Sequence, residues 1–223
     1  MAKGNGELVT RNFDAFVSYG QQAATSGGNI VGDLLLFTKG EYVAGQGKDE
    51  VAEDTRVVVN MDTMIVGWQR WENKKPVEQI MGLLFDAFQP PPRTTLGRMD
   101  DKEWEMDVNG KPIDPWQFTN QFICKDEADS TVYTFATSSR GGIGAIGTLT
   151  KAYGEQARTM KQGAMPVIEL GVDSYPHKEY GKTYVPVFPI VDWSSVDIFD
   201  KEDKPAKKAA PKNPVKKLFS RRA

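Results

Sequence analysis

The sequence holds a single cysteine and a single histidine, and this scarcity excludes several kinds of site. Cys124 cannot form a disulfide within the chain, and together with His177 it cannot supply the usual ligand sets of zinc. A Ser/His/Asp or Cys/His catalytic group has the same shortage of parts. We therefore expect no metal ion and no cofactor, and a binding protein rather than an enzyme.

The sequence also lacks long apolar runs. Its first residues, MAKGNGELVTRNF, do not contain the apolar core of a signal peptide. Among its longest apolar stretches are Ile30–Val31 and Leu34–Phe37, which are far too short to span a bilayer. We expect a soluble, cytoplasmic protein that makes no contact with membranes.

Charge is distributed unevenly along the chain. The formal net charge is −2, but from Lys201 onward nine Lys and Arg residues stand against two acidic ones, a net of +7. The preceding residues therefore carry −9, which argues against coating duplex DNA with the whole surface but permits a local basic groove. The tail is rich in Lys, Pro and Ala, so we predict that it is disordered.

The length of 223 residues, with 39% hydrophobic residues, suits one domain with tails. We predict a flexible segment over 1–29, a β-rich domain over 30–198 and a basic disordered tail over 199–223. The patterns predict the following elements: one strand over 34–43 interrupted at Gly40, one bent strand or two strands over 56–72, a hairpin of 116–125 with 131–137, a helix over 139–160, and a final strand pair of 166–172 with 183–193 at a sheet edge.

The order of these elements is several strands, one long helix and two further strands. OB-type barrels commonly place a helix between their third and fourth strands. The predicted fold is therefore mainly β: an OB-like five-stranded barrel with one long helix between the third and fourth strands, extra hairpins and disordered tails.

Glycines at the start of the predicted helix match the dinucleotide-binding spacing G-x-G-x-x-G at Gly142, Gly144 and Gly147. The surrounding sequence does not alternate strands and helices, as a doubly wound nucleotide-binding sheet requires. We favour a structural interpretation, in which Gly141, Gly144 and Gly147 let the helix approach the barrel closely.

Aromatic and basic residues occur together on several segments. The strongest group is Trp68, Arg70 and Trp71 with Lys74, because an exposed ring beside a cation can stack a base and hold its phosphate. Burial of each tryptophan in the core remains the alternative. The complete candidate nucleic-acid-binding set is Lys39, Tyr42, Trp68, Arg70, Trp71, Lys74, Arg140, Lys151, Arg158, Lys178, Tyr180 and Lys182.

One enzymatic alternative remains open. Asp62, Glu72 and Lys74 loosely match the carboxylates and lysine of magnesium-dependent nucleases, in which paired carboxylates hold the metal. Such short patterns arise often by chance, so binding without cleavage is the favoured interpretation.

Several strings together resemble a family of uncharacterised phage and prophage proteins over roughly residues 30–193. They are GDLLLFTKGEYVAGQ, VGWQRWENKKP, DPWQFTN, TFATSSRGGIGAIGTLTKAYG and ELGVDSYPHKEYGKTYVPVF. The element order is similar to that of phage single-stranded-DNA-binding proteins of replication and recombination clusters. The resemblance implies sequence-nonspecific binding of single-stranded DNA in the bacterial host cytoplasm; a phage structural or host-interaction protein is the further alternative.

The resemblance also bears on partners. Phage proteins of that kind typically end in an acidic tail with a terminal aromatic residue, whereas this chain ends in KKLFSRRA. The opposite charge puts in doubt a role of the tail in recruiting replication or recombination proteins, although Leu218–Phe219 offers a short docking peptide. A homo-oligomer is compatible with the sequence.

Overall fold

The computed structural model describes residues 30–108, 110–178 and 181–200. The first strands are β1 (Asp33–Thr38), β2 (Glu41–Ala44), β3 (Asp49–Val51), β4 (Arg56–Glu72) and β5 (Lys75–Leu83). The middle of the chain forms the short 3₁₀ turns η1 (Arg93–Thr95) and η2 (Asp101–Glu103), then β6 (Glu105–Met106), β7 (Pro112–Ile113), β8 (Trp116–Asp126) and β9 (Val132–Thr137). The last part holds α2 (Arg140–Gln156), η3 (Ala157–Thr159), β10 (Ala164–Glu169), β11 (Gly171–His177), β12 (Gly181–Val187), β13 (Ile190–Ser195) and η4 (Val196–Ile198).

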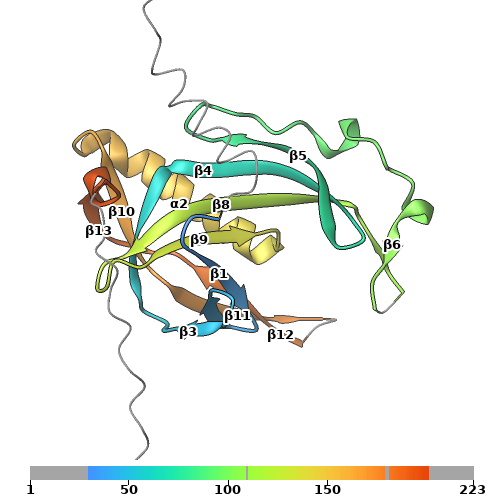
Figure 1. Ribbon diagram of the computed structural model, residues 1–223, viewed down its shortest axis with the longest axis horizontal. Coiled ribbons are helices and arrows are strands. Elements are labelled where there is room, and N and C mark those ends of the chain that lie inside the picture. Colours follow the sequence, from blue (N-terminus) through green and yellow to red (C-terminus); the bar gives the residue numbers. More distant parts are fainter. Residues whose placement is uncertain (1–29, 109, 179–180, 201–223) are drawn as a thin grey trace, which may run out of the picture.

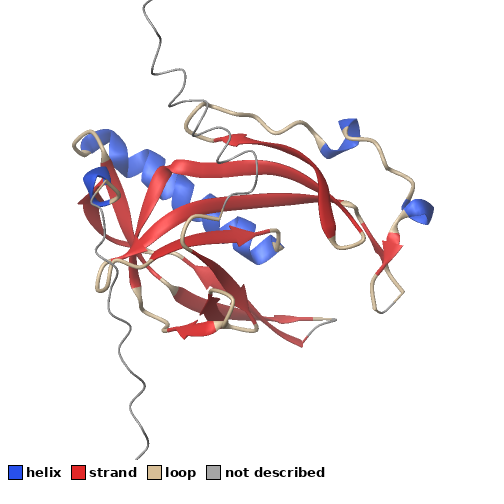
Figure 2. Cartoon of the chain, viewed as in Figure 1, coloured by secondary structure: helices blue, strands red, loops and turns tan. Residues whose placement is uncertain are grey.

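Strands dominate the described residues, and they gather in one curled sheet. Nine of them form this sheet in the order β13-β10-β4-β8-β9-β1-β2-β3, with β5 also paired to β4. The sheet curls into a half-barrel, and α2 is the long helix beside it (Figures 1 and 2). The prediction of a mainly β protein with one long helix is confirmed, whereas the sheet has nine strands rather than the five that were predicted.

Strand β4 organises the sheet. It has 17 residues, and a run of β-branched side chains directly after its first residue, Val57–Val59, is fully buried. It pairs antiparallel with β8 and β10 near its start, and with β8 and β5 farther along. The register with β8 shifts between Asn60 and Ile65, so the region is one strand with an irregularity. Of the two predicted forms, the single bent strand is the one observed.

The predicted strand over 34–43 is wrong, because the chain reverses there. β1 and β2 form an antiparallel hairpin in which Thr38 lies opposite Glu41. The two connecting residues, Lys39 and Gly40, have φ angles of 55° and 90°, as a tight two-residue hairpin turn requires. Gly40 therefore marks a turn and not a bulge within a strand.

Helix α2 packs its apolar side on the sheet. Its N-cap, Ser139, accepts a hydrogen bond from Gly142 N, and Ile146 and Leu149 are buried in the core. Gly141 lies against β12, where an added Cβ would be 2.5 Å from Val185 Cγ1. Gly144 and Gly147 have no such neighbour within 4 Å, so for these two the predicted close approach is wrong.

The chain after α2 forms four strands rather than the predicted pair. β10 pairs with β13 in the large sheet, and β11 pairs with β12 in a separate two-stranded ribbon. The predicted edge position is confirmed for β13, which ends the sheet order. The predicted hairpin of 116–125 with 131–137 is also confirmed, as β8 and β9.

Candidate nucleic-acid interface

Tryptophans concentrate in one projection of the fold, which we call the arm (residues 67–118). The arm contains the outer part of β4, all of β5, the loop with β6 and β7, and the start of β8, and it extends to the right in Figure 1. Four of the five tryptophans belong to it: Trp68, Trp71, Trp104 and Trp116. The fifth, Trp193, lies on β13 at the opposite end of the molecule and stacks on Tyr153 with ring centroids 6.0 Å apart.

Two of the arm tryptophans serve its internal packing. Trp116 is 3% exposed. Trp68 is half-buried, donates from Nε1 to Pro91 O at 2.9 Å, and meets the Phe118 ring edge-on at 5.1 Å. Trp68 was predicted to stack a base, but these contacts tie it to the arm's own backbone.

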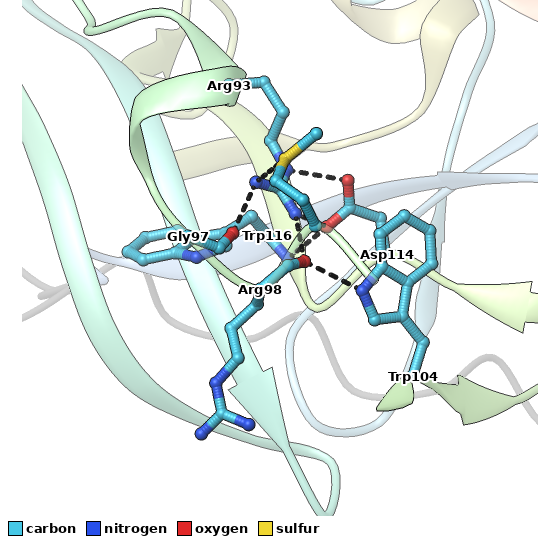
Figure 3. A network of polar contacts seen from close by, with 7 residues as sticks. Arg93, Gly97, Arg98, Trp104, Asp114 and Trp116 are labelled. Carbon is cyan, nitrogen blue, oxygen red and sulfur yellow. Dashed lines mark hydrogen bonds and ion pairs between the residues drawn. The ribbon is translucent and has the colours of Figure 1, made fainter. Parts of the chain in front are cut away.

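A polar network fixes the loop that crosses the arm (Figure 3). The Arg93 guanidinium donates to both carboxylate oxygens of Asp114, at 2.7 Å each. It also donates to the carbonyl oxygens of Gly97 and Arg98, at 2.8 and 2.9 Å. Trp104 Nε1 donates to the same Arg98 carbonyl at 2.8 Å. The loop is therefore anchored to Asp114, directly before β8.

Trp71 stands between two cavities. One, of about 290 Å³, is lined by Trp71, Lys74, Glu105, Ile113, Asp114, Pro115 and Gln117. The other, of about 330 Å³, is lined by Trp71, Glu72, Asn73, Arg98, Glu103, Trp104, Glu105 and Pro115. Trp71 N donates to Pro115 O at 2.9 Å, which fixes the residue between the cavities. Trp71 is half-buried and borders both cavities, whereas Trp104, also half-buried, borders the second one alone.

The cations near Trp71 differ in availability. The Arg70 side chain is 18% exposed, is paired with Glu72 and with Glu78 at 3.0 Å, and lies over the Trp116 ring. Its hydrogen bond with Glu78 raises the pKa of Arg70. Arg70 is thus committed to neighbouring carboxylates. Lys74 is exposed in the β4–β5 turn and has no ion pair among the described residues, so it is free to meet a phosphate or a base.

A second aromatic-basic group lies on the β11–β12 ribbon (residues 171–187). Lys182 Nζ lies 4.8 Å from the centroid of the Tyr184 ring, which is 40% exposed. The ring borders the β1–β2 turn, since an added Cβ on Gly40 would be 2.9 Å from Tyr184 Cδ1. The exposed Lys39 of that turn therefore lies next to the ribbon, which joins two sequence-predicted lysines.

Tyr184 was missed by the sequence analysis. The alternation of Lys182 and Tyr184 along one face of a strand was the available signal. Lys178 is exposed at the end of β11, and Tyr180 lies outside the described residues.

Tyr42 does not belong to this surface, so its prediction as a binding residue is corrected. It is 1% exposed, packs on Phe37, and donates its hydroxyl to Gly171 O at 2.7 Å. A ring enclosed in this way has no free face for a base. The sequence of β2 alone could not show which of its two faces is turned to the core.

The basic residues of α2 spread along the helix instead of forming one site. Arg140 lies at its N-terminus beside the ribbon, whereas Arg158 lies beyond its C-terminus, about 27 Å away at 1.5 Å per residue. Lys151 is exposed and 4.0 Å from Glu155. Arg140 is therefore the member of this set that accompanies the ribbon.

The structure does not bring the predicted nuclease residues together. Asp62 and Glu72 are ten residues apart on β4, a span of up to about 33 Å along a strand. Burial raises the pKa of Asp62, while Glu72 is paired with Arg70. Within residues 30–108, 110–178 and 181–200, no three His, Cys, Asp or Glu side chains cluster closely enough to hold a metal ion.

Comparisons with known proteins found no matching family model, no matching curated protein and no matching solved structure. No helix in the described part of the chain has both the length and the apolarity of a membrane span.

Proposed function

We propose that this protein binds single-stranded DNA with little sequence preference, using the arm and the ribbon together. The observation that supports this proposal is their common direction: both project toward the right-hand end of the molecule in Figure 1. Each carries an aromatic ring next to a lysine: the arm has Trp71 with Lys74, and the ribbon has Tyr184 with Lys182. Ring stacking combined with backbone cations is how proteins hold single strands without reading sequence.

The chain connections support the same proposal. β4 pairs with both β8 and β10, β8 pairs with β9, and α2 joins β9 to β10. The first four strands and the helix of an OB fold are connected in the same way. OB folds bind oligonucleotides with the loop between their first and second strands and the loop between their fourth and fifth strands. In this assignment, the arm is the first loop and the ribbon extends the hairpin of the fourth and fifth strands.

Binding should be tested by fluorescence anisotropy with labelled single- and double-stranded oligonucleotides, at about 50 and about 200 mM salt. Trp71→Ala should weaken single-strand binding by about 1–3 kcal/mol, because it removes a stacking surface. Lys182→Gln should lower affinity for all single-stranded sequences alike and reduce the salt slope by about 1. Trp193→Ala is the matched control, because that ring lies at the opposite end.

The proposal fails if Trp71→Ala and Lys182→Gln bind as tightly as the unaltered protein while their thermal unfolding is unchanged. A Trp193→Ala variant that loses as much affinity as Trp71→Ala would also contradict the assignment of the site.

Protein binding by the arm is the second candidate. Seven of its large hydrophobic side chains are exposed: Val77, Leu84, Phe85, Met99, Met106, Val108 and Ile113. Exposed apolar side chains mark a protein interface where they form a contiguous patch. This function would be favoured over the first if the chain binds a protein partner at high salt, if that binding requires Phe85 or Met106, and if the chain has no affinity for oligonucleotides.

A further inference from the structure

We propose that the 290 Å³ cavity beside Trp71, which we call the Trp71 pocket, accepts one unstacked guanine base. The inference rests on the proposed function, because it assigns a preferred base to one subsite of an otherwise nonspecific single-strand surface. Three apolar residues line the pocket: Trp71, Ile113 and Pro115. Three polar side chains with hydrogen-bonding groups available to a ligand also line it: Lys74, Glu105 and Gln117.

The walls suit a flat aromatic ring. Trp71 lines the pocket, and an indole is a ring on which any base can stack. Pro115 is held near Trp71 by the hydrogen bond from Trp71 N to Pro115 O. Asp114, the carboxylate beside Pro115, is occupied by Arg93 and by Trp116 N, so it helps to shape the pocket and is not available to a ligand. The pocket is therefore formed before any ligand arrives.

Glu105 supplies a positioned acceptor. One of its oxygens, Oε1, accepts a hydrogen bond from Asn73 N at 2.8 Å, which ties the carboxylate to the β4–β5 turn. Glu105 has no ion pair among the described residues, so the remaining acceptor sites of its carboxylate are available to a ligand. A carboxylate accepts hydrogen bonds and cannot donate them, and it therefore selects a base edge that carries donors.

Lys74 supplies the complementary donor on the same pocket. Its ammonium has no ion pair among the described residues and can only donate. Guanine alone among the four bases presents two adjacent donors, N1–H and N2–H, next to a carbonyl acceptor, O6. Glu105 would receive the two donors and Lys74 would donate to O6. Adenine, cytosine and thymine each offer one donor group on that edge, so they satisfy this pair less completely.

The experiment compares a thymine homopolymer of about 16 nucleotides with the same strand carrying one central guanine or one central inosine. Inosine lacks the N2 amino group and is otherwise the same base. Affinities are measured for the full chain, for Glu105→Gln and for Glu103→Gln. Glu103 is the matched control, because it lines the second cavity and not the Trp71 pocket.

The unaltered protein should bind the guanine strand about tenfold more tightly than the homopolymer, and inosine should give a smaller gain. Glu105→Gln should lose this preference while still binding the homopolymer, and Glu103→Gln should keep it. Equal affinity of the unaltered protein for all three strands would overturn the guanine subsite and leave the proposed function intact. Absence of binding to every strand at about 50 mM salt would overturn the proposed function itself, and the subsite with it.

Discussion

Residues of one type take different roles here according to their surroundings. Trp116 is buried in the arm, Trp68 is tied to the Pro91 carbonyl, and Trp71 borders two cavities. Tyrosines divide in the same way, since Tyr42 is enclosed in the core while Tyr184 remains 40% exposed. Stacking on a ligand is thus available to Trp71, which borders two cavities, and to the exposed Tyr184.

The buried tyrosines should make the protein sensitive to alkali. Burial raises the pKa of Tyr42 above its usual value, with Glu53 adding to the shift, and burial raises the pKa of Tyr133 to about 12. The native state therefore holds these protons at a pH where the unfolded chain, with a tyrosine pKa of about 10, has released them. Because the unfolded state then binds fewer protons, the contribution of these tyrosines to stability should be fully present below about pH 10 and be lost as pH rises above it.

Tyr42→Phe separates the two contributions of this residue. The variant should lose about 0.5–1.5 kcal/mol at neutral pH, because the hydrogen bond to Gly171 O is removed. It should also lose less stability than the unaltered protein between about pH 9 and about pH 11. Urea unfolding at a series of pH values measures both effects. Parallel pH profiles for the two proteins would show that Tyr42 does not titrate on unfolding.

Among the elements, α2 combines two kinds of glycine. At Gly141 and Gly142 the helix approaches its neighbours so closely that an added Cβ would overlap Val185 and Thr137. At Gly144 and Gly147 the surroundings are open, and glycine there gives the helix backbone freedom without a packing benefit. All four positions are glycines near the start of one helix, and they differ in how closely neighbouring strands approach them.

Alanine substitutions on α2 should therefore have opposite signs. Gly144→Ala and Gly147→Ala should each stabilise the protein by about 0.5–1 kcal/mol, because alanine restricts the unfolded chain and fits the helix. Gly142→Ala should destabilise it, because the new Cβ would lie 2.3 Å from Thr137 Oγ1. Thermal unfolding of the three variants checks this order, and a stabilised Gly142→Ala protein would show that α2 is less tightly seated than its geometry indicates.

At the scale of the whole molecule, the net charge of the folded part opposes the binding of an anion. Residues 1–200 carry a net of −9, and ion pairs such as that of Arg70 with Glu78 occupy cations of the arm. The proposed affinity for single-stranded DNA therefore depends on a few local lysines on the two projections, with further attraction from the +7 of residues 201–223.

Deleting residues 201–223 should lower the affinity for single-stranded DNA and flatten its dependence on salt, because fewer counterions are released on binding. The thermal unfolding midpoint should stay the same, since the tail composition cannot support a packed core. Anisotropy at several salt concentrations and calorimetry of both proteins measure the two effects. A large fall in the midpoint would show instead that the tail is part of the folded structure.

The sequence by itself determined those features that depend on local pattern. Runs rich in β-branched and aromatic residues predicted the β8–β9 hairpin and strand structure over 56–72, and apolar residues at helical spacing predicted α2. The neighbourhood of Trp71 and Lys74 was also visible, because residues three apart across a tight turn remain close in any hairpin.

Only the tertiary structure decided which side chains meet across long distances in the chain. It buried Tyr42 under Gly171, brought the Gly40 turn against Tyr184, and closed the Trp71 pocket with Glu105 and Pro115. It also separated Asp62 from Glu72, which a short motif had grouped as metal ligands of a nuclease. Pairing of distant strands sets these contacts, and local propensity carries no information about which strand a given edge will join.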